Sequence, residues 1–423
     1  MSNVMSADVV IIGGGIIGSS TAYEMARAGL DVVLCEMRNL GSGASGRCGG
    51  MMCHCYGREN NLEHAEERLK FSRYNSMMLE KRQQELDIDY EVRRHGLLDV
   101  WTSEEEAEEG RRLYEQEIAQ IGDSVKILDR QEAISEMPTL NPNLVFGARY
   151  RAEDGNLAPY KLCAAMGFGA QKLGARIMTH TKVEKILIEK DRIVGVQTDK
   201  GTIYAKWVLN ATNGWSRTLC KEAEAVLPVR EAACVTEAIG KVPGQPFEML
   251  LKGQFAYGGT QTATGNLTIG GPAHPRDKRV GYYNETMYID EVRRMASYLK
   301  EVFPRLEDLK IIRAWIGTMG FSKDAMPLIG QSSLTEGLLI AAGFVAGVNK
   351  GCTVGRIMTD IVTTGEVSLD LDMSLYDPGR FLKRPPIENW PETYDISINH
   401  DYIAALRHGT AENFKLPYDL TVR

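Results

Sequence analysis

The sequence lacks the features that mark nucleic-acid-binding and membrane-spanning proteins. Its 49 Lys and Arg residues are outnumbered by 56 Asp and Glu residues, and a net charge of −7 without a basic block argues against nucleic acid as a partner. No apolar run is long enough to span a bilayer, and the longest one, residues 338–348, is interrupted by glycines. The N-terminus has neither a basic start nor the apolar core of a signal peptide, so we expect a cytoplasmic protein.

Cysteine and the usual catalytic patterns are also scarce. The chain has eight cysteines among 423 residues, and in a cytoplasmic protein of this size we expect thiols or metal ligands rather than disulfides. We find no internal repeat, no low-complexity tract, no Ser/His/Asp set and no paired carboxylates. What remains is a globular chain of ordinary composition, long enough for two or three domains.

The most informative stretch is the first forty residues. A β-branched run at residues 6–12 leads into Gly13-Gly14-Gly15-Ile16-Ile17-Gly18, then a helical stretch, then a second strand that ends at Glu36. In such a βαβ unit the three spaced glycines allow a tight turn, close approach of a pyrophosphate and close packing of the helix, whose N-terminus favours the anion. Glu36 follows Gly15 by about 20 residues, where an acid binds ribose hydroxyls. The pattern predicts an adenine dinucleotide site.

Two further stretches are rich in small residues. Residues 40–56 combine glycines with serines, which indicates backbone lying against a ligand, and Ser45 and Arg47 are suited to contact phosphate oxygens. Residues 210–215, Asn-Ala-Thr-Asn-Gly-Trp, end a predicted strand with side chains small enough to pack on a cofactor.

Together these stretches resemble the D-amino-acid-oxidase-like family of FAD enzymes, which includes sarcosine oxidases, glycine oxidase and the dye-linked proline and hydroxyproline dehydrogenases. The resemblance rests on the N-terminal glycines with Glu36, on residues 45–50 and 210–215, and on the pair 319–330 and 337–343. It extends to about Asp377 and is greatest for the β-type catalytic subunits of multi-subunit sarcosine oxidases and amino-acid dehydrogenases.

The resemblance implies an α/β fold with a Rossmann-like FAD-binding domain of the glutathione-reductase type. An α+β substrate domain built on a mixed antiparallel sheet is inserted into it. We expect the discontinuous FAD-binding domain at residues 1–88, 150–222 and 312–366, and the substrate domain at 89–149 and 223–311. Residues 367–423 form a C-terminal extension. Its aromatic and aliphatic content predicts that it is ordered across this subunit or a partner.

The resemblance also implies how FAD is bound. Residues 343–350 would pass the flavin pyrimidine, and the following helix would point its N-terminus at the flavin N1–C2 edge. Lys350 and the helix dipole would stabilise the negative charge of the reduced flavin there, the alternative being an exposed lysine at a helix start. The predicted cofactor-binding residues are Gly13, Gly15, Ile16, Ile17, Gly18, Glu36, Met37, Arg38, Ser42, Ser45, Gly46, Arg47, Cys48, Gly49, Gly50, Met51, Met52, Val183, Ala211, Thr212, Asn213, Trp215, Gly317, Gly343, Val348, Asn349 and Lys350.

Departures from the family pattern narrow the prediction. Gly317 or a neighbour stands where some members attach FAD to a cysteine, so we expect FAD to be non-covalent. Lys161 lies near the position of the histidine that carries FMN in multi-subunit sarcosine oxidases, so covalent FMN is not expected. Thr268 stands where oxidases place an oxygen-activating lysine, which favours a dehydrogenase that passes electrons to a protein or a quinone.

The substrate side is less clearly marked. Met319 replaces the arginine that holds the substrate carboxylate in glycine oxidase. The candidates for a different carboxylate anchor are Arg58, Arg313 and Lys350, with Tyr257 as a weaker one. By resemblance His54 and Tyr56 lie on the substrate side. The predicted catalytic residues are Lys350, His54 and Tyr257.

Three cysteines, Cys48, Cys53 and Cys55, are unusual for the family. With His54 they are numerous enough for a zinc or iron–sulfur site, but the loop would have to fold awkwardly around a metal as well as FAD. Reactive thiols near the flavin are a second interpretation. We favour the third, in which they are small side chains that pack against the isoalloxazine, and we predict no metal.

The predicted activity is FAD-dependent oxidation of the Cα–N bond of a secondary or imino amino acid such as proline, hydroxyproline, sarcosine or an opine. The neutral amine would lose hydride to flavin N5 without an obligatory base. We expect the catalytic subunit of a hetero-oligomeric dehydrogenase with electron-accepting flavin or iron–sulfur subunits. The alternatives are an oxygen-using oxidase of the same substrates, a nicotinamide-dependent dehydrogenase, and a non-catalytic flavin-bearing subunit of an electron-transfer complex.

Overall fold

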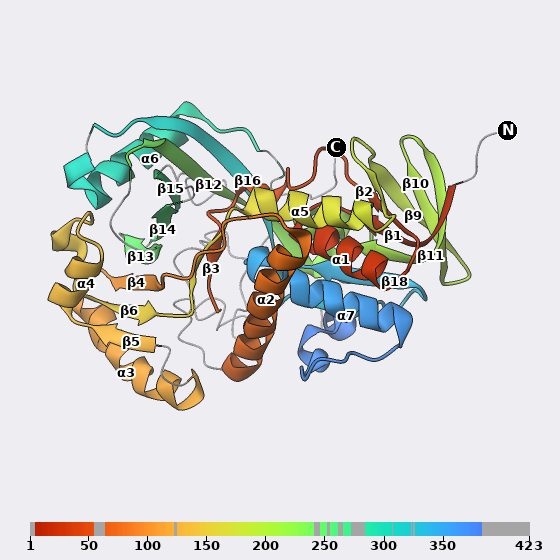
Figure 1. The fold of residues 1–423 in the computed structure, drawn as a ribbon, viewed down its shortest axis with the longest axis horizontal. Helices are drawn as coiled ribbons and strands as arrows, with labels where there is room; N and C mark the ends of the chain where they lie inside the picture. Colours follow the sequence, from red (N-terminus) through yellow and green to blue (C-terminus); the bar gives the residue numbers. More distant parts are fainter. Residues whose placement is uncertain are drawn as a thin grey trace.

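The computed structural model describes residues 5–54, 64–121, 125–240, 246–251, 254–260, 265–271, 283, 285–306, 308–322, 324 and 326–382. The described chain forms two halves, each built on a β-sheet, with a long helix between them (Figure 1). This helix, α2 (Ala65–Leu86), contacts α7 of the first half and α3 of the second. Residues 383–423, most of the predicted C-terminal extension, lie outside the described residues.

The first half is a mostly parallel sheet centred on β1. Its strand order is β17-β18-β11-β1-β2-β8, with β9 and β10 attached to β11 as an antiparallel meander. The aliphatic ends of β1, β2 and β18 are buried, as expected for strands covered on both faces. The strands are β1 (Met5–Ile12), β2 (Val32–Cys35), β8 (Arg176–Met178), β9 (Val183–Glu189), β10 (Arg192–Thr198), β11 (Gly201–Asn210), β17 (Leu328–Gln331) and β18 (Leu338–Ala342).

Three helices share the core of this half. The central one, α1 (Ile16–Arg27), packs against α5 (Pro159–Lys172) and α7 (Gly351–Thr363). Gly355 permits the close approach of α7 to α1, because a Cβ there would lie 3.0 Å from the carbonyl oxygen of Ser20. The buried side chains of these helices form one apolar cluster with the sheet.

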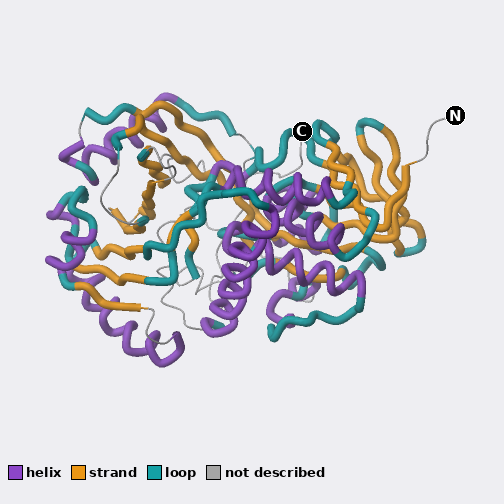
Figure 2. Tube along the Cα trace, viewed as in Figure 1, coloured by secondary structure: helices purple, strands orange, loops and turns teal. Residues whose placement is uncertain are grey.

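The second half is a mixed sheet in the order β16-β12-β15-β14-β13-β4-β6-β5, in which only β13 and β4 run parallel among the described neighbours. Its helices lie on the outer side, away from the first half (Figure 2). The strands are β4 (Leu97–Trp101), β5 (Val125–Leu128), β6 (Gly147–Arg151), β12 (Val226–Ala238), β13 (Phe247–Leu251), β14 (Gln254–Thr260), β15 (Asn266–Gly271) and β16 (Ile311–Ser322). The helices are α3 (Glu104–Ile121), α4 (Arg130–Glu136) and α6 (Ile289–Val302).

The two faces of the second sheet differ in chemistry. One face joins side chains of α4 and α6 in an apolar cluster that includes Phe247, whose ring meets Phe303 edge-on at 5.8 Å. Because side chains alternate along a strand, the residues between the core positions face the other way. Asp99 and Glu248 are such residues, and both are buried. The second sheet therefore turns buried charges toward the first half.

The predicted fold class is confirmed: an α/β half of Rossmann type carries a second half with a mixed sheet. The sheets differ from the predicted bounds, residues 150–222 and 312–366 for the FAD-binding domain, at two places. Strand β16 pairs with β12 along its length, and the last two residues of β6 also belong to the second sheet. All five residues of β4 are buried. In the part of the chain that the structure describes, no helix is long and apolar enough to cross a bilayer.

Candidate functional site

A cavity of about 470 Å³ lies where the two halves meet. The first half contributes the carboxyl ends of β1 and β2, two short 3-10 helices, η1 (Ala44–Arg47) and η7 (Gly347–Asn349), and the loop before η7. The second half contributes residues of β12, β13 and β16. Ligands of open α/β sheets bind at this edge of the strands, so the cavity is the candidate functional site.

The glycine turn between β1 and α1 forms one wall of the cavity. Gly13 has φ +105°, which favours glycine, and a Cβ on Gly18 would lie 1.9 Å from the carbonyl oxygen of Gly13. The first N–H of α1, on Ile16, donates to Ser45 Oγ at 3.0 Å. The turn thus brings bare backbone to the cavity beside the positive end of a helix.

Glu36 directly follows β2 and is nine-tenths buried at the cavity. Its Oε2 accepts a hydrogen bond from the backbone of Gly14 at 2.7 Å, and its Oε1 accepts one from the backbone of Arg38 at 2.8 Å. Each carboxylate oxygen has a second lone pair, so the two amides orient Glu36 and leave acceptor capacity.

Two arginines of the cavity wall meet one acid from the second half. Glu285 lies 2.6 Å from Arg38 and 2.9 Å from Arg47. Arg47 also donates to the carbonyl oxygen of Ile316 at 2.6 Å. Burial lowers the pKa of Arg47, and the neighbouring Glu285 offsets part of this effect. Both arginines are therefore engaged with the second half.

The loop between β18 and α7 forms the opposite part of the first-half wall. Asn213 holds its start, since Oδ1 accepts from the N–H groups of Gly343 at 3.0 Å and of Phe344 at 2.9 Å. Asn349 holds its end, since its amide exchanges hydrogen bonds with Cys53: Oδ1 accepts from the backbone N–H at 3.2 Å and Nδ2 donates to Sγ at 3.1 Å. Lys350 then lies at the N-cap of α7.

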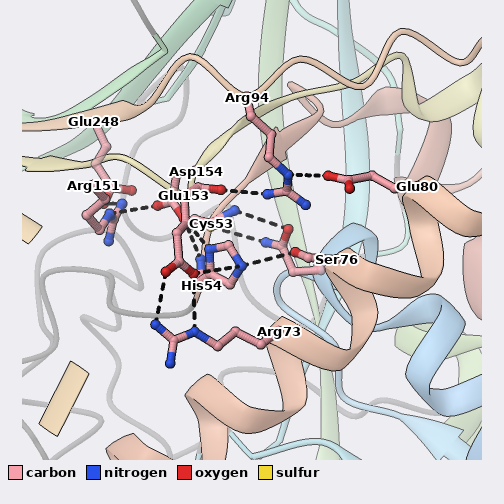
Figure 3. A network of polar contacts seen from close by, with 11 residues as sticks. Cys53, His54, Arg73, Ser76, Glu80, Arg94, Arg151, Glu153, Asp154 and Glu248 are labelled. Carbon is pink, nitrogen blue, oxygen red and sulfur yellow. Dashed lines mark hydrogen bonds and ion pairs between the residues drawn. The ribbon is translucent and has the colours of Figure 1, made fainter. Parts of the chain in front are cut away.

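A chain of buried polar contacts runs from the cavity wall behind Cys53 to α2 (Figure 3). Glu248 lines the cavity, and its carboxylate lies 2.8 Å from the guanidinium of Arg151. Arg151 also lies 2.8 Å from Asp154, whose Oδ1 is 2.6 Å from Nδ1 of His54. With Nδ1–H donating to the carboxylate, Nε2 accepts from the Ser76 hydroxyl at 3.0 Å when the ring is neutral.

Ionic contacts determine the charges in this network. Burial alone would lower the pKa of Arg151, but Glu248 and Asp154 outweigh it and hold the pKa above its ordinary value, so the guanidinium stays charged. Burial alone would raise the pKa of Glu153, but its bidentate pair with Arg73 at 3.0 and 3.1 Å holds the pKa below its ordinary value. Arg94 bridges Glu80 to the carbonyl oxygen of Glu153.

Comparison with known proteins identifies the family to which the chain belongs. The family model described as FAD dependent oxidoreductase (DAO) matches residues 8–361, which is most of the chain. The chain belongs to this family of FAD dependent oxidoreductases. The resemblance inferred from the glycine turn and the later motifs is thus confirmed.

Three relatives illustrate its place within the FAD dependent oxidoreductases. The chain is 28% identical over 401 residues to dimethylglycine dehydrogenase of Homo sapiens, which covers 89% of this chain but 44% of that protein. It is 26% identical over 372 residues to glycine oxidase of Bacillus subtilis, covering 86% and 95%. The crystal structure of L-proline dehydrogenase from P. horikoshii matches with a TM-score of 0.78 and 28% identity, covering 90% and 99%. The chain thus spans less than half of the first relative.

The cavity fits the FAD of this family. A Cβ on Gly15 would lie 3.0 Å from Ser45 Oγ, and a Cβ on Gly317 would meet no closer atom than Cβ of Arg47 at 3.5 Å, so both glycines keep space open along the wall. Glu36 provides oriented carboxylate oxygens of the kind that accept from ribose hydroxyls. These observations agree with a bound dinucleotide.

Most of the predicted cofactor-binding residues line the cavity. Four of them do not line it: Gly18, Ser42, Gly46 and Met52. Of these, Gly18 and Gly46 pack against backbone, where a Cβ would lie within 2.2 Å of a carbonyl oxygen. The predicted residues that line it are Gly13, Gly15, Ile16, Ile17, Glu36, Met37, Arg38, Ser45, Arg47, Cys48, Gly49, Gly50, Met51, Val183, Ala211, Thr212, Asn213, Trp215, Gly317, Gly343, Val348, Asn349 and Lys350.

The predicted catalytic residues are not brought together. Lys350 lines the cavity, but His54 does not, because it is buried behind Cys53 with Asp154 and Ser76 as its partners. His54 thus lies one residue behind the cavity wall, of which Cys53 is part. The side chain of Tyr257 lies outside the described residues.

Other predicted substrate-side residues also lie elsewhere. Arg313 is exposed and stacks on Trp315 at 5.3 Å, and it does not line the cavity. Thr268 faces the first half by strand alternation, yet its buried side chain does not line the cavity. Arg58 and Tyr56 lie outside the described residues, whereas Met319 lines the cavity as expected.

Residues that the sequence did not suggest also line the cavity. Arg68 and Phe71 of α2 are spaced by three positions and so share one helix face. Glu248 is the single acid of the apolar strand Phe-Glu-Met-Leu-Leu, a sign that could have marked it. Tyr376, after the last helix, carried no such sign because it is distant in sequence from every other lining residue.

The cysteines near the cavity are thiols. Burial raises the pKa of Cys48 to about 11, and its Sγ donates to the carbonyl oxygen of Ser45 at 3.2 Å. Burial likewise raises the pKa of Cys35 to about 12. Cys55 lies outside the described residues, and within them no group of three His, Cys, Asp or Glu side chains is arranged to hold a metal.

Proposed function

We propose that this protein binds FAD across the cavity and oxidises the Cα–N bond of a small secondary or imino amino acid, such as proline, hydroxyproline, sarcosine or an opine. The observation that carries the proposal is that one cavity connects the glycine turn with a charged wall. The cavity extends from the glycine turn and Glu36 to a wall with two buried charges of opposite sign, Arg68 on α2 and Glu248 on β13. A zwitterionic amino acid is complementary to such a pair.

The two ends of the cavity suit the two parts of the cofactor. The glycine turn and the N-terminus of α1 would hold the pyrophosphate, and Glu36 would accept from the ribose hydroxyls. Residues 343–350 and the N-terminus of α7 would lie along the flavin, with Lys350 beside its negative edge. When bound, FAD accepts the hydride from the substrate carbon. Consistent with the sequence-based division, the second half would supply the substrate side.

The charges of the second sheet support an amine-binding wall. Arg151 pairs with Glu248, and the buried carboxylates of this sheet face and its adjoining turn outnumber the buried guanidiniums: Asp99, Asp154 and Glu248 against Arg149 and Arg151. Glu248 would accept a hydrogen bond from the substrate amine, and Arg68 would hold the carboxylate. Phe71, Phe344 and Tyr376 line the cavity and would exclude water from the reacting carbon.

The electron acceptor is proposed from the sequence. No lysine stands at position 268, which favours a dehydrogenase with electron-accepting flavin or iron–sulfur subunits. Two of the three relatives carry the printed name dehydrogenase, and the third is named glycine oxidase. An oxygen-using oxidase of the same substrates is therefore the second candidate.

Non-covalent FAD binding predicts that acid denaturation releases all of the yellow colour into the supernatant. Glu36→Ala is expected to raise the Kd for FAD by about 5- to 150-fold, because losing the carboxylate strands hydrogen-bonding groups at a cost of about 1–3 kcal/mol. Titration of the apoprotein with FAD measures this. Glu336→Ala, which removes an exposed acid paired with Arg192, is the control and should leave the Kd unchanged. Colour that stays in the pellet would contradict non-covalent binding.

An anaerobic screen tests the proposed activity. Purified protein is mixed with proline, hydroxyproline, sarcosine, dimethylglycine and glycine, and flavin absorbance is followed without oxygen. We expect a secondary amino acid to bleach the flavin. If the protein carries FAD and no amine bleaches it, the enzymatic proposal is wrong and a non-catalytic flavin subunit is favoured. A colourless protein active with nicotinamide would overturn FAD itself.

Within the same screen, Arg68 can be tested as the carboxylate anchor. Arg68→Met should raise the substrate concentration for half-maximal bleaching by about tenfold or more, since a lost charged hydrogen bond costs about 1.5–3 kcal/mol. Arg313→Met is the matched control, because Arg313 is exposed and stacks on Trp315 outside the cavity. Equal effects of both substitutions would refute the anchor.

A further inference from the structure

Asn75 ties α2 to the segment that leads into α7. The side chain is 1% exposed and faces α7. Its Nδ2 donates to the carbonyl oxygen of Val348 at 3.0 Å, and its Oδ1 accepts from the N–H of Cys352 at 2.9 Å. One amide group thus bridges the two ends of residues 348–352, where η7 ends and α7 begins.

The bridged segment is the part of α7 that meets the cavity. Val348, Asn349 and Lys350 all line the cavity, and Lys350 is the N-cap. The first N–H groups of a helix have no partner inside it, so their direction depends on what surrounds the helix end. Asn75 takes the N–H of Cys352, the second residue of α7, and so fixes the orientation of this end.

Contacts other than those of Asn75 also hold α2 against α7. Thr353 Oγ1 donates to the carbonyl oxygen of Phe71 at 3.2 Å, one turn before Asn75 on α2. Phe71, Leu79 and Cys352 belong to the same apolar cluster. Asn75 differs from these contacts because it holds the backbone on both sides of Lys350, rather than the helix surface.

We propose that Asn75 is a positioning residue that sets the reduction potential of the flavin, an inference that rests on the proposed placement of FAD. By closing residues 348–352 it keeps the positive end of α7 and Lys350 aimed at the cavity. These groups stabilise the reduced flavin, which is negatively charged, more than the oxidised flavin. If residues 348–352 are held less firmly, the site favours the reduced flavin over the oxidised flavin less strongly, so the reduction potential falls.

The test compares three variants of the full chain with bound FAD: Asn75→Ala, Asn75→Asp and Thr353→Val. The midpoint potential is measured by equilibration with a reference dye, and thermal unfolding is followed separately. We expect Asn75→Ala to lower the relative affinity for reduced over oxidised flavin about tenfold, which is a shift of about −30 mV for a two-electron couple. Thr353→Val, which removes a different α2–α7 hydrogen bond, should lower stability but leave the potential unchanged.

Asn75→Asp keeps the size and the acceptor but loses the donor to Val348 and adds negative charge, so its potential should fall at least as far. This variant keeps the test decisive if the alanine variant does not fold. If the potential of both Asn75 variants equals that of wild type, or if Thr353→Val shifts it equally, Asn75 is structural only and the inference is wrong. Protein that binds no FAD would instead refute the proposed function, so the two failures are distinguishable.

Discussion

Replacing Arg151 by methionine is expected to lower the free energy of unfolding by about 3–5 kcal/mol, because removing one partner of a buried ionic network leaves the other charges without compensation. The side chain of Arg151 is 4% exposed, and its partners Glu248 and Asp154 are 5% and 1% exposed. Methionine fills much of the volume of the arginine side chain but leaves the buried carboxylates of Glu248 and Asp154 without the guanidinium that compensates them. Urea-induced unfolding of the wild type and the variant measures the difference.

A surface ion pair gives the matched control for Arg151. Arg176 lies 2.7 Å from Asp31, and the two side chains are 39% and 52% exposed. Arg176→Met should change the free energy of unfolding by no more than about 1 kcal/mol, as for other exposed pairs. Adding Glu248→Gln to Arg151→Met should recover part of the loss, since it removes one of the stranded charges. If Arg151→Met costs no more than Arg176→Met, the network does not stabilise the fold.

Gly18→Ala is expected to weaken FAD binding about as strongly as Glu36→Ala. A Cβ at this position would lie 1.9 Å from the carbonyl oxygen of Gly13 and 3.2 Å from Cγ2 of Ile11, and the obstacle is backbone. The helix α1 must therefore move away from β1, which displaces the turn that would meet the pyrophosphate. Overpacking of this kind costs about 1–3 kcal/mol, so the Kd for FAD should rise about 5- to 150-fold.

The other end of α1 provides the control for Gly18. Gly29 has φ +86°, and a Cβ there would meet no atom within 4 Å. Gly29→Ala should lower the free energy of unfolding by about 1 kcal/mol because of its backbone conformation, while the Kd for FAD stays at the wild-type value. FAD binding that is lost equally in both variants would mean that general destabilisation, and not the turn, determines affinity.

The end of the cavity at the glycine turn could be predicted because its residues are close in sequence. β1, the glycine turn, α1 and β2 follow one another within about 30 residues, and Glu36 lies at the end of β2. Each of these features depends on the local periodicity of apolar residues or on a glycine at which any side chain would clash with neighbouring atoms. The family pattern then extended the prediction to Asn213 and to residues 343–350, which line the same cavity.

The end of the cavity at the second half could not be predicted in the same way. A shift of one position along a strand reverses the direction of a side chain, so the residues that face a cavity depend on strand register. Register alone is not sufficient, because Thr268 faces the first half and still does not line the cavity, and His54, which lies beyond the end of β3, does not line it either. The packing of the two halves also decides which side chains reach the cavity. The pairing of β16 with β12, which places β16 in the second sheet, likewise joins strands far apart in the sequence.

By itself the sequence determined the family, the FAD-type βαβ unit and most of the residues around it, since glycine spacing and apolar periodicity act over short distances. The tertiary structure alone decided which charges meet at the other end. The buried network joins three separate segments of the chain. Arg151 contacts Glu248, and Asp154, three residues after Arg151, contacts both Arg151 and His54. Such contacts depend on how two sheets and α2 pack, and this arrangement leaves no repeating pattern in the sequence.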